Sequence, residues 1–143
     1  MIILDTNVLS ALMRDPPEQV VVAWLDRQPR LSIWTTSITI LEIHFGIAIM
    51  SSGKRRTLLS EAFAKTINEK LERRVAAFDT DAAHEAAALM SMRQQKGRAD
   101  DLRDAMIAGV ALAHHATLAT RNIRHFDDLS VPVVNPWESA GQK

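Results

Sequence analysis

Short, mostly apolar runs alternate along this chain with longer segments in which apolar residues recur at helical spacing. The runs lack the polar alternation of a sheet with one solvated face, so they indicate strands that are covered on both faces. The predicted strands span residues 1–4, 31–35, 75–78, 117–120 and 131–134. The predicted helices span residues 7–14, 18–27, 38–50, 55–73, 81–95 and 101–115.

This order of elements predicts an α/β fold in which a mostly parallel sheet of about five strands lies between helices. The chain has 143 residues and no internal repeat, so we expect a single domain over residues 1–143. In sheets of this kind, ligands bind beyond the carboxyl ends of the strands. Polar residues that follow a predicted strand are therefore the first candidates for a functional site.

The composition restricts the chemistry more than it identifies a partner. The chain carries 17 basic and 17 acidic residues, a balance that neither indicates nor excludes a nucleic-acid partner. It has no cysteine, which excludes disulfides and thiolate metal sites and is compatible with a reducing compartment. No apolar run approaches the ~20 residues of a membrane span, and no secretory leader is evident. We therefore expect a cytoplasmic protein without a membrane partner.

The segment ILDTNVLS places a carboxylate, a hydroxyl and an amide directly after the first predicted strand. These groups belong to Asp5, Thr6 and Asn7. Their position at a strand end is where a site belongs in a parallel sheet.

A second polar group follows the predicted strand 117–120, in the segment LATRNIRHFDDL. Thr120 and Asn122 stand past this strand end as Asp5 and Thr6 do past the first. Ordinary turn chemistry is the alternative for Asn122, because Asn favours turns. We expect Asp127 and Asp128 to form a solvated turn, and the alternative is that either of them approaches the site.

Two more acids stand in or beside apolar stretches of predicted helices. Glu42 lies in the helix SITILEIHFGIAIM, whose predicted buried stripe is Ile38, Leu41, Phe45 and Ile49. Asp104 immediately precedes a run of apolar residues and glycine at 105–113. A buried carboxylate is costly unless it is paired, protonated or bound to a metal. The alternatives are that Glu42 reaches water or a basic residue, and that Asp104 stabilises the helix dipole.

Carboxylates gathered in one pocket repel one another, and a divalent cation removes that repulsion. Oxygen ligands without His or Cys favour Mg²⁺ or Mn²⁺ over Zn²⁺. Ions held in this way commonly catalyse phosphodiester hydrolysis, because they polarise the phosphate and activate water.

The segments ILDTNVLS, SITILEIHFG, DAMIAGVALAHHATLATRN and VPVVNPW, in this order and spacing, resemble PIN-domain proteins of the VapC/FitB toxin group. The resemblance extends from Met1 to Trp137 and implies a three-layer PIN fold. It implies a Mg²⁺- or Mn²⁺-dependent endoribonuclease toxin of a type II toxin–antitoxin module, which inhibits translation and growth. It also implies a homodimer and a VapB/FitA-like antitoxin that binds operator DNA.

The same resemblance assigns roles to the candidate residues. Asp5, Glu42 and Asp104 would be the acids that hold the metal, and Thr6 and Asn7 would steady Asp5. The fourth acidic position of the family falls on Asn122, a departure that puts a tight second metal site in doubt. We expect Asn122 to orient a metal-bound water, with Thr120 in support. The antitoxin groove would lie on the helical surfaces of residues 18–27 and 38–73, for which plain core packing is the alternative.

Basic residues near the predicted site are candidates for holding RNA. Arg121 and Arg124 follow the fourth predicted strand, and further candidates are Lys96, Arg98, Arg103 and the cluster Lys54, Arg55 and Arg56. A solvated helix face is the alternative for the charged runs.

Two other functions remain open from the sequence alone. A phosphatase with a nucleophilic aspartate at a strand end needs a second Asp two residues later, where this chain has Asn7. A non-catalytic PIN scaffold that binds RNA, or regulates transcription with its antitoxin, is the main alternative to the ribonuclease.

Overall fold

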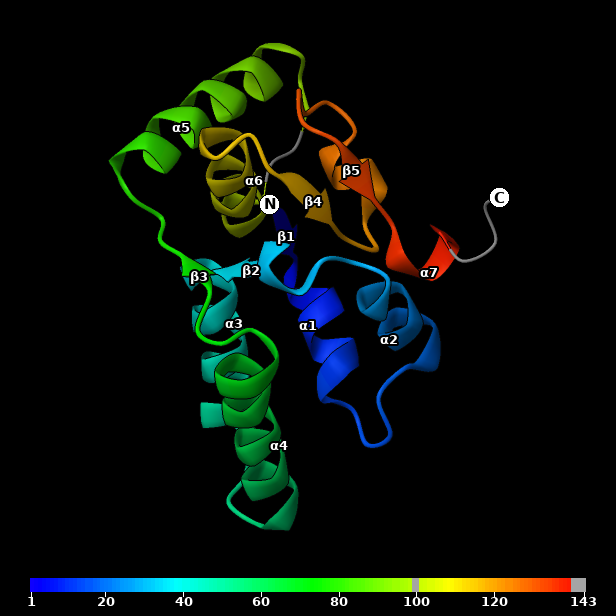
Figure 1. Cartoon of the computed structure of the whole chain (residues 1–143). Coiled ribbons are helices and arrows are strands. Elements are labelled where there is room, and N and C mark those ends of the chain that lie inside the picture. The colour runs from blue at the N-terminus through cyan, green and yellow to red at the C-terminus, as the bar shows by residue number, and fades with distance from the viewer. Residues whose placement is uncertain (99–100, 140–143) are drawn as a thin grey trace.

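The computed structural model describes residues 1–98 and 101–139. Within them, five parallel strands form one sheet in the order β3-β2-β1-β4-β5 (Figure 1). The strands are β1 (Ile2–Leu4), β2 (Ile33–Thr36), β3 (Val75–Ala76), β4 (Thr117–Ala119) and β5 (Val133–Val134). The predicted α/β fold with a parallel sheet is therefore confirmed, with some strands shorter than the sequence predicts.

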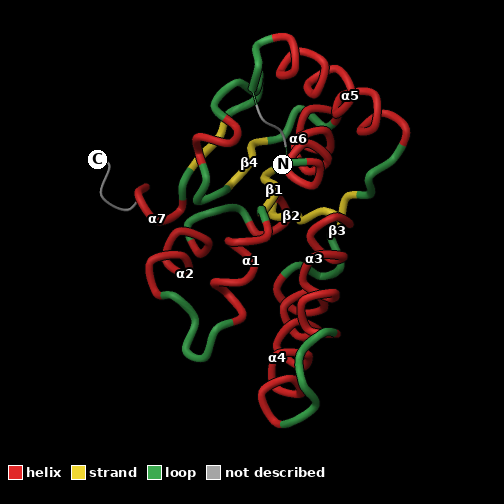
Figure 2. The backbone as a smooth tube through the Cα atoms, turned by 180° about the vertical axis from the view of Figure 1, so that it is seen from behind, coloured by secondary structure: helices red, strands yellow, loops and turns green. Residues whose placement is uncertain are grey.

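The helices are α1 (Thr6–Met13), α2 (Gln19–Asp26), α3 (Ser37–Ala48), α4 (Lys54–Lys65), α5 (Thr80–Gln95), α6 (Leu102–Ala113) and α7 (Pro136–Ser139). Figures 1 and 2 show α5 and α6 together on one side of the sheet, α1 and α2 on the other, and α3 with α4 extending from the β2–β3 edge. No helix in the described part of the chain is long and apolar enough to cross a membrane.

The sheet separates two hydrophobic cores, because successive strand residues point to opposite faces. Ile3 packs with α5 and α6 residues such as Leu89 and Ile107, whereas Leu4 packs with α1 and α2 residues such as Val8 and Val21. Both Ile3 and Leu4 are fully buried. This double coverage explains why β1 contains no polar residue before its end.

The predicted long helix 55–73 is interrupted. Its regular part, α4, ends at Lys65, and Thr66–Lys70 form a π-helical turn. The Thr66 hydroxyl donates to the Ala62 carbonyl oxygen at 2.8 Å, and the Leu71 N–H donates to the Thr66 carbonyl oxygen at 3.0 Å. The wider turn carries Leu71 into the core, where it is 1% exposed.

The predicted buried stripe of α3 is wrong for three of its four residues. Ile38 is buried, but Leu41, Phe45 and Ile49 are 55%, 55% and 68% exposed. Most positions of this helix are apolar, so periodicity does not select which face meets the sheet. In the structure the buried face includes Thr39 and Ile43 instead.

Asp128 also departs from its predicted place in a solvated turn. Its carboxylate accepts two hydrogen bonds of 2.9 Å from the guanidinium of Arg93, which is 2% exposed. The hydrogen bond from Arg93 lowers the pKa of Asp128 below its ordinary value. Asp127 is exposed, as expected, and forms a 3.0 Å ion pair with Arg98.

Candidate active site

The topology brings the predicted residues to one edge of the sheet. β1 is the central strand: the chain first builds β2 and β3 on one side of it and then crosses to build β4 and β5 on the other. Such a switch point opens a crevice beyond the carboxyl ends of the strands. Asp5 follows β1, Thr120 follows β4, and Thr36 ends β2 where α3 begins.

Asp5 is the N-cap of α1 and is 4% exposed. Its Oδ1 accepts a 2.8 Å hydrogen bond from the Thr6 N–H. Its Oδ2 accepts hydrogen bonds from the Thr120 hydroxyl at 2.7 Å and from the Asn7 side-chain amide at 3.4 Å. All these donors are uncharged, so the buried carboxylate is oriented without being neutralised.

Burial raises the pKa of Asp5 to about 6. The hydrogen bonds from Thr120 and Thr6 oppose this rise, and the negative charges of Asp104 and Glu42 add to it. The three acids that the sequence singles out are therefore close enough to act electrostatically on one another.

Glu42 reaches the site from the second turn of α3. The Thr6 hydroxyl donates to Glu42 Oε1 at 2.5 Å and also contacts the Thr39 hydroxyl at 3.2 Å. Thr36 caps α3 by accepting a 3.1 Å hydrogen bond from the Thr39 N–H. Thr6 thus links the first acid to the second, because its N–H binds Asp5 and its hydroxyl binds Glu42.

Asp104 lies in the first turn of α6, which starts at the same edge of the sheet. Asp101 caps this helix, and its Oδ1 accepts the N–H groups of Arg103 and Asp104 at 2.9 and 3.3 Å. Asp104 Oδ2 lies 3.0 Å from Nδ1 of His125. The Arg103 Nε lies 3.5 Å from Glu42 Oε2, so α6 and α3 meet at the mouth of the site.

Asn122 stands at the rim rather than among the carboxylates. Its N–H donates to the Thr120 hydroxyl at 3.0 Å, and its side chain is exposed. Within the described residues its side-chain amide makes no hydrogen bond. The backbone of Asn122 is thus held in place, whereas its side-chain amide is left available to solvent among the described residues.

The predicted RNA-binding arginines are placed differently from one another. The Arg121 N–H donates to Asn7 Oδ1 at 3.1 Å, while its guanidinium stacks 4.6 Å from the centre of the Trp137 ring. Arg124 is exposed, and its carbonyl oxygen accepts a 2.6 Å hydrogen bond from Arg98. Neither guanidinium contacts an acid of the site.

Sequence reasoning missed His125 and the Arg93–Asp128 pair. Arg93 continues the buried face of α5 made by Ala82, Ala86 and Leu89, and this helical spacing is a signal for a buried, paired arginine. Arg93 also donates to the His125 carbonyl oxygen at 2.8 Å, so it fixes the loop that brings His125 to Asp104. No comparable pattern marks His125 itself.

The donor set suits a hard divalent cation, although the described side chains do not converge on a single point. In residues 1–98 and 101–139, no three acidic or histidine side chains lie close enough together to hold one ion as they stand. Asp5, however, is a buried carboxylate that contacts neutral donors only, beside two further carboxylates. Carboxylate oxygens of this kind fit Mg²⁺ or Mn²⁺.

A model of the PIN domain matches residues 2–131 of the sequence. The chain belongs to the PIN-domain family. Among PIN-domain relatives, it is 38% identical to a VapC ribonuclease of Sinorhizobium fredii, Y4jK, over 98% of this chain and 100% of the relative. It is 35% identical to the toxin FitB of Neisseria gonorrhoeae, over 96% of this chain and 99% of FitB.

Solved structures agree with these sequence relationships. A structure described as FitAB bound to the IR36 DNA fragment superimposes with a TM-score of 0.85 and 35% identity. The match covers 96% of this PIN domain chain and 96% of that chain. The resemblance to VapC and FitB toxins that the sequence motifs carry is thereby confirmed.

Proposed function

We propose that this PIN domain is a Mg²⁺- or Mn²⁺-dependent endoribonuclease, the toxin of a toxin–antitoxin pair. The observation that carries the proposal is Asp5. It is a buried carboxylate with a raised pKa, next to Glu42 and Asp104, and in the described part of the chain it contacts only neutral donors. A structural acid in such a place would have a cationic partner, as Asp128 has in Arg93.

In this proposal Asp5, Glu42 and Asp104 would hold the ion, and a bound ion would supply polarisation of the scissile phosphate and activation of water. Thr120 and Asn7 orient the Asp5 carboxylate, and Thr6 holds Glu42 beside it. Asn122 lies at the rim, where its amide can bind and orient a water. Attack by water needs no 2′-hydroxyl of the RNA, so the products carry 5′-phosphate and 3′-hydroxyl ends.

The experiment is cleavage of total bacterial RNA by purified protein, with Mg²⁺, with Mn²⁺ and with EDTA. We expect discrete fragments that need the metal and that disappear in Asp104→Asn. Asp101→Asn is the matched control, because Asn also caps helices and the variant removes one neighbouring charge. Cleavage that persists in EDTA would contradict the proposed metal dependence. Absence of cleavage by folded protein with either Mg²⁺ or Mn²⁺ would contradict the proposal and favour the non-catalytic scaffold.

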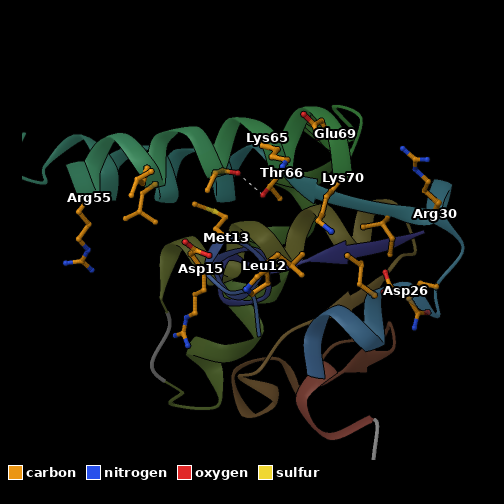
Figure 3. Close-up of a pocket in the computed structure, with 18 of the residues that line it drawn as sticks. Leu12, Met13, Asp15, Asp26, Arg30, Arg55, Lys65, Thr66, Glu69 and Lys70 are labelled. Carbon is orange, nitrogen blue, oxygen red and sulfur yellow. Dashed lines mark hydrogen bonds between the residues drawn. The ribbon is translucent and has the colours of Figure 1, made fainter. Parts of the chain in front are cut away.

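An antitoxin partner is supported by a groove of about 1340 Å³ between α1, α2 and α4 (Figure 3). Figure 3 shows Leu12 and Met13 on one side of the groove, with Lys65 and Lys70 facing them. Further lining residues are the apolar Leu25, Leu58 and Leu59, the basic Arg14, Arg30, Lys54 and Arg55, which with Lys65 and Lys70 outnumber the acids, and the acidic Asp15, Asp26 and Glu69. We propose that an amphipathic antitoxin segment with acidic flanks binds here, and that the antitoxin carries the contacts with operator DNA.

The groove differs in part from the predicted antitoxin surface. The contributions from residues 18–27 and from α4 are present, but the lining includes the end of α1 and no residue of α3. Asp5 caps the start of α1, and the end of α1 lines the groove. The length of this short helix therefore separates a segment bound in the groove from the site.

The exposed stripe of α3, formed by Leu41, Phe45 and Ile49, supports a homodimer. Glu42 follows Leu41 in α3 and contacts Arg103 of α6, and the neighbouring Leu102 of α6 is 59% exposed. Large exposed apolar patches commonly mark protein interfaces. We propose that two copies pair through this surface, with their sites close to the shared interface.

A further inference from the structure

Arg103 lies across the mouth of the acidic site. Its Nε stands 3.5 Å from Glu42 Oε2, and its side chain is 52% exposed. The backbone of Arg103 is fixed, because its N–H donates to the capping carboxylate of Asp101 at 2.9 Å. Its guanidinium is therefore carried by a rigid helix start on a long, half-exposed side chain.

The two oxygens of Glu42 are used differently. Oε1 accepts the Thr6 hydroxyl, which holds the carboxylate in place. Among the residues that the structure describes, Oε2 contacts only Arg103, so it is the oxygen that remains for a metal ion. Ion pairs whose guanidinium is half exposed to water contribute little stability, so the guanidinium leaves Glu42 at small cost. An arginine also stays protonated in proteins, so a divalent cation on Glu42 repels it.

Two of the other described arginines near this edge are already engaged. Arg121 stacks on Trp137, and Arg98 pairs with Asp127 and Asp128. Arg103 differs from them because its partner is a carboxylate of the site itself. Once the Arg103 guanidinium loses this partner, its forked N–H donors can bind two oxygens of a phosphate.

We propose that Arg103 is a substrate-binding residue that changes partners. It pairs with Glu42 while the site holds no divalent cation, and it binds a phosphate of the RNA once such a cation has taken Glu42. The inference rests on the proposed ribonuclease function, and it gives Arg103 two effects of opposite sign. Arg103 weakens metal binding in the absence of RNA and strengthens RNA binding in the presence of metal.

The test is the variant Arg103→Ala, measured in two ways. Titration calorimetry with Mn²⁺ alone should show an affinity about twofold to fivefold higher than in the wild type, since a competing exposed ion pair is removed. Steady-state cleavage of a single-stranded RNA at saturating Mn²⁺ should show KM raised about tenfold, with a smaller change in kcat, as expected for one lost charged hydrogen bond. The dependence of kcat/KM on salt should weaken by about 0.7 in slope, equivalent to one phosphate contact.

Two further variants separate this role from general charge and folding effects. Arg103→Lys keeps the competing charge but loses the fork, so Mn²⁺ affinity should match the wild type while KM lies between the other two proteins. Arg27→Ala removes an exposed arginine at the end of α2. The chain continues from there to the amino end of β2, at the side of the sheet opposite to the site, so this variant should change neither Mn²⁺ affinity nor KM.

Loss of both metal and RNA affinity in Arg103→Ala would show a structural role and overturn the inference. Unchanged Mn²⁺ affinity and KM would overturn it as well. If the wild-type protein binds Mn²⁺ but cleaves no RNA, the proposed function fails and the RNA half of the inference fails with it. The calorimetric comparison still decides whether Arg103 competes for Glu42.

Discussion

At the scale of single residues, the buried carboxylate of Asp5 and the partly buried carboxylate of Asp128 differ in how they are stabilised. Asp128 is neutralised by a two-bond contact with Arg93, which lowers its pKa. Asp5 is surrounded by neutral donors and by other acids, and burial raises its pKa to about 6. A side chain kept charged at such a cost indicates a function other than stability.

Replacing Asp5 should therefore stabilise the metal-free protein. The rise of the Asp5 pKa from 3.8 to about 6 corresponds to about 3 kcal/mol against the ionised form. Because this pKa is higher in the folded than in the unfolded chain, the contribution of Asp5 to stability falls as pH rises through the window from 3.8 to about 6. We expect Asp5→Asn to raise the free energy of unfolding by about 2 kcal/mol near neutral pH.

Urea unfolding in EDTA measures this effect. The advantage of Asp5→Asn should be largest near pH 7.5 and shrink as the pH falls from about 6 to below 3.8, where the wild-type carboxyl is protonated in both states. A variant that is less stable than the wild type near pH 7.5 would contradict the assigned environment of Asp5.

At the scale of elements, the first turn of α6 holds Asp104 in place because α6 packs unusually close to α5. A Cβ added to Gly109 would lie 2.5 Å from the Ala82 carbonyl oxygen and 2.9 Å from the Ala86 Cβ. Neither the backbone oxygen nor the methyl group can move aside on its own, so the helices would have to separate.

We expect Gly109→Ala to lower the free energy of unfolding by about 2 kcal/mol and to reduce RNA cleavage, because a shift of α6 carries Asp104 with it. The matched control is Gly46→Ala in α3, where an added Cβ meets nothing within 4 Å. That change should leave stability equal or raise it by up to about 1 kcal/mol. Thermal unfolding of both variants measures the difference, and equal effects would contradict the close packing at Gly109.

The order of the elements could be predicted from the sequence because hydrophobic periodicity and strand-end chemistry are local signals. Asp5 directly after a short apolar strand, and Asp104 directly before the apolar run 105–113, were identifiable for that reason. The buried face of α3 could not be predicted, because an almost wholly apolar helix offers several equivalent faces. The contact between His125 and Asp104 depends on the loop held by Arg93, which is a tertiary feature with no local pattern.

At the scale of the whole molecule, the exposed residues of α3 predict how copies associate. Phe45 is 55% exposed in the middle of the apolar stripe, so Phe45→Glu places a charge in the proposed dimer interface. We expect the wild type to be a dimer and Phe45→Glu a monomer by light scattering coupled to size-exclusion chromatography.

Leu31→Glu is the control for that variant. Leu31 is 74% exposed and lies in the turn before β2, away from α3. The control should keep the wild-type mass. A monomeric wild type, or a Phe45→Glu protein that remains dimeric, would contradict the assigned interface.

The central claim is that Asp5, with Glu42 and Asp104, holds the divalent cation that RNA cleavage needs. The most direct measurement is the rate of RNA cleavage as a function of Mn²⁺ concentration, for the wild type and for Asp5→Asn. The account predicts a rate that rises from zero to saturation in the wild type and stays at background in Asp5→Asn, although the variant is folded and more stable. Equal metal-dependent rates in the two proteins, or cleavage by the wild type without metal, would contradict it.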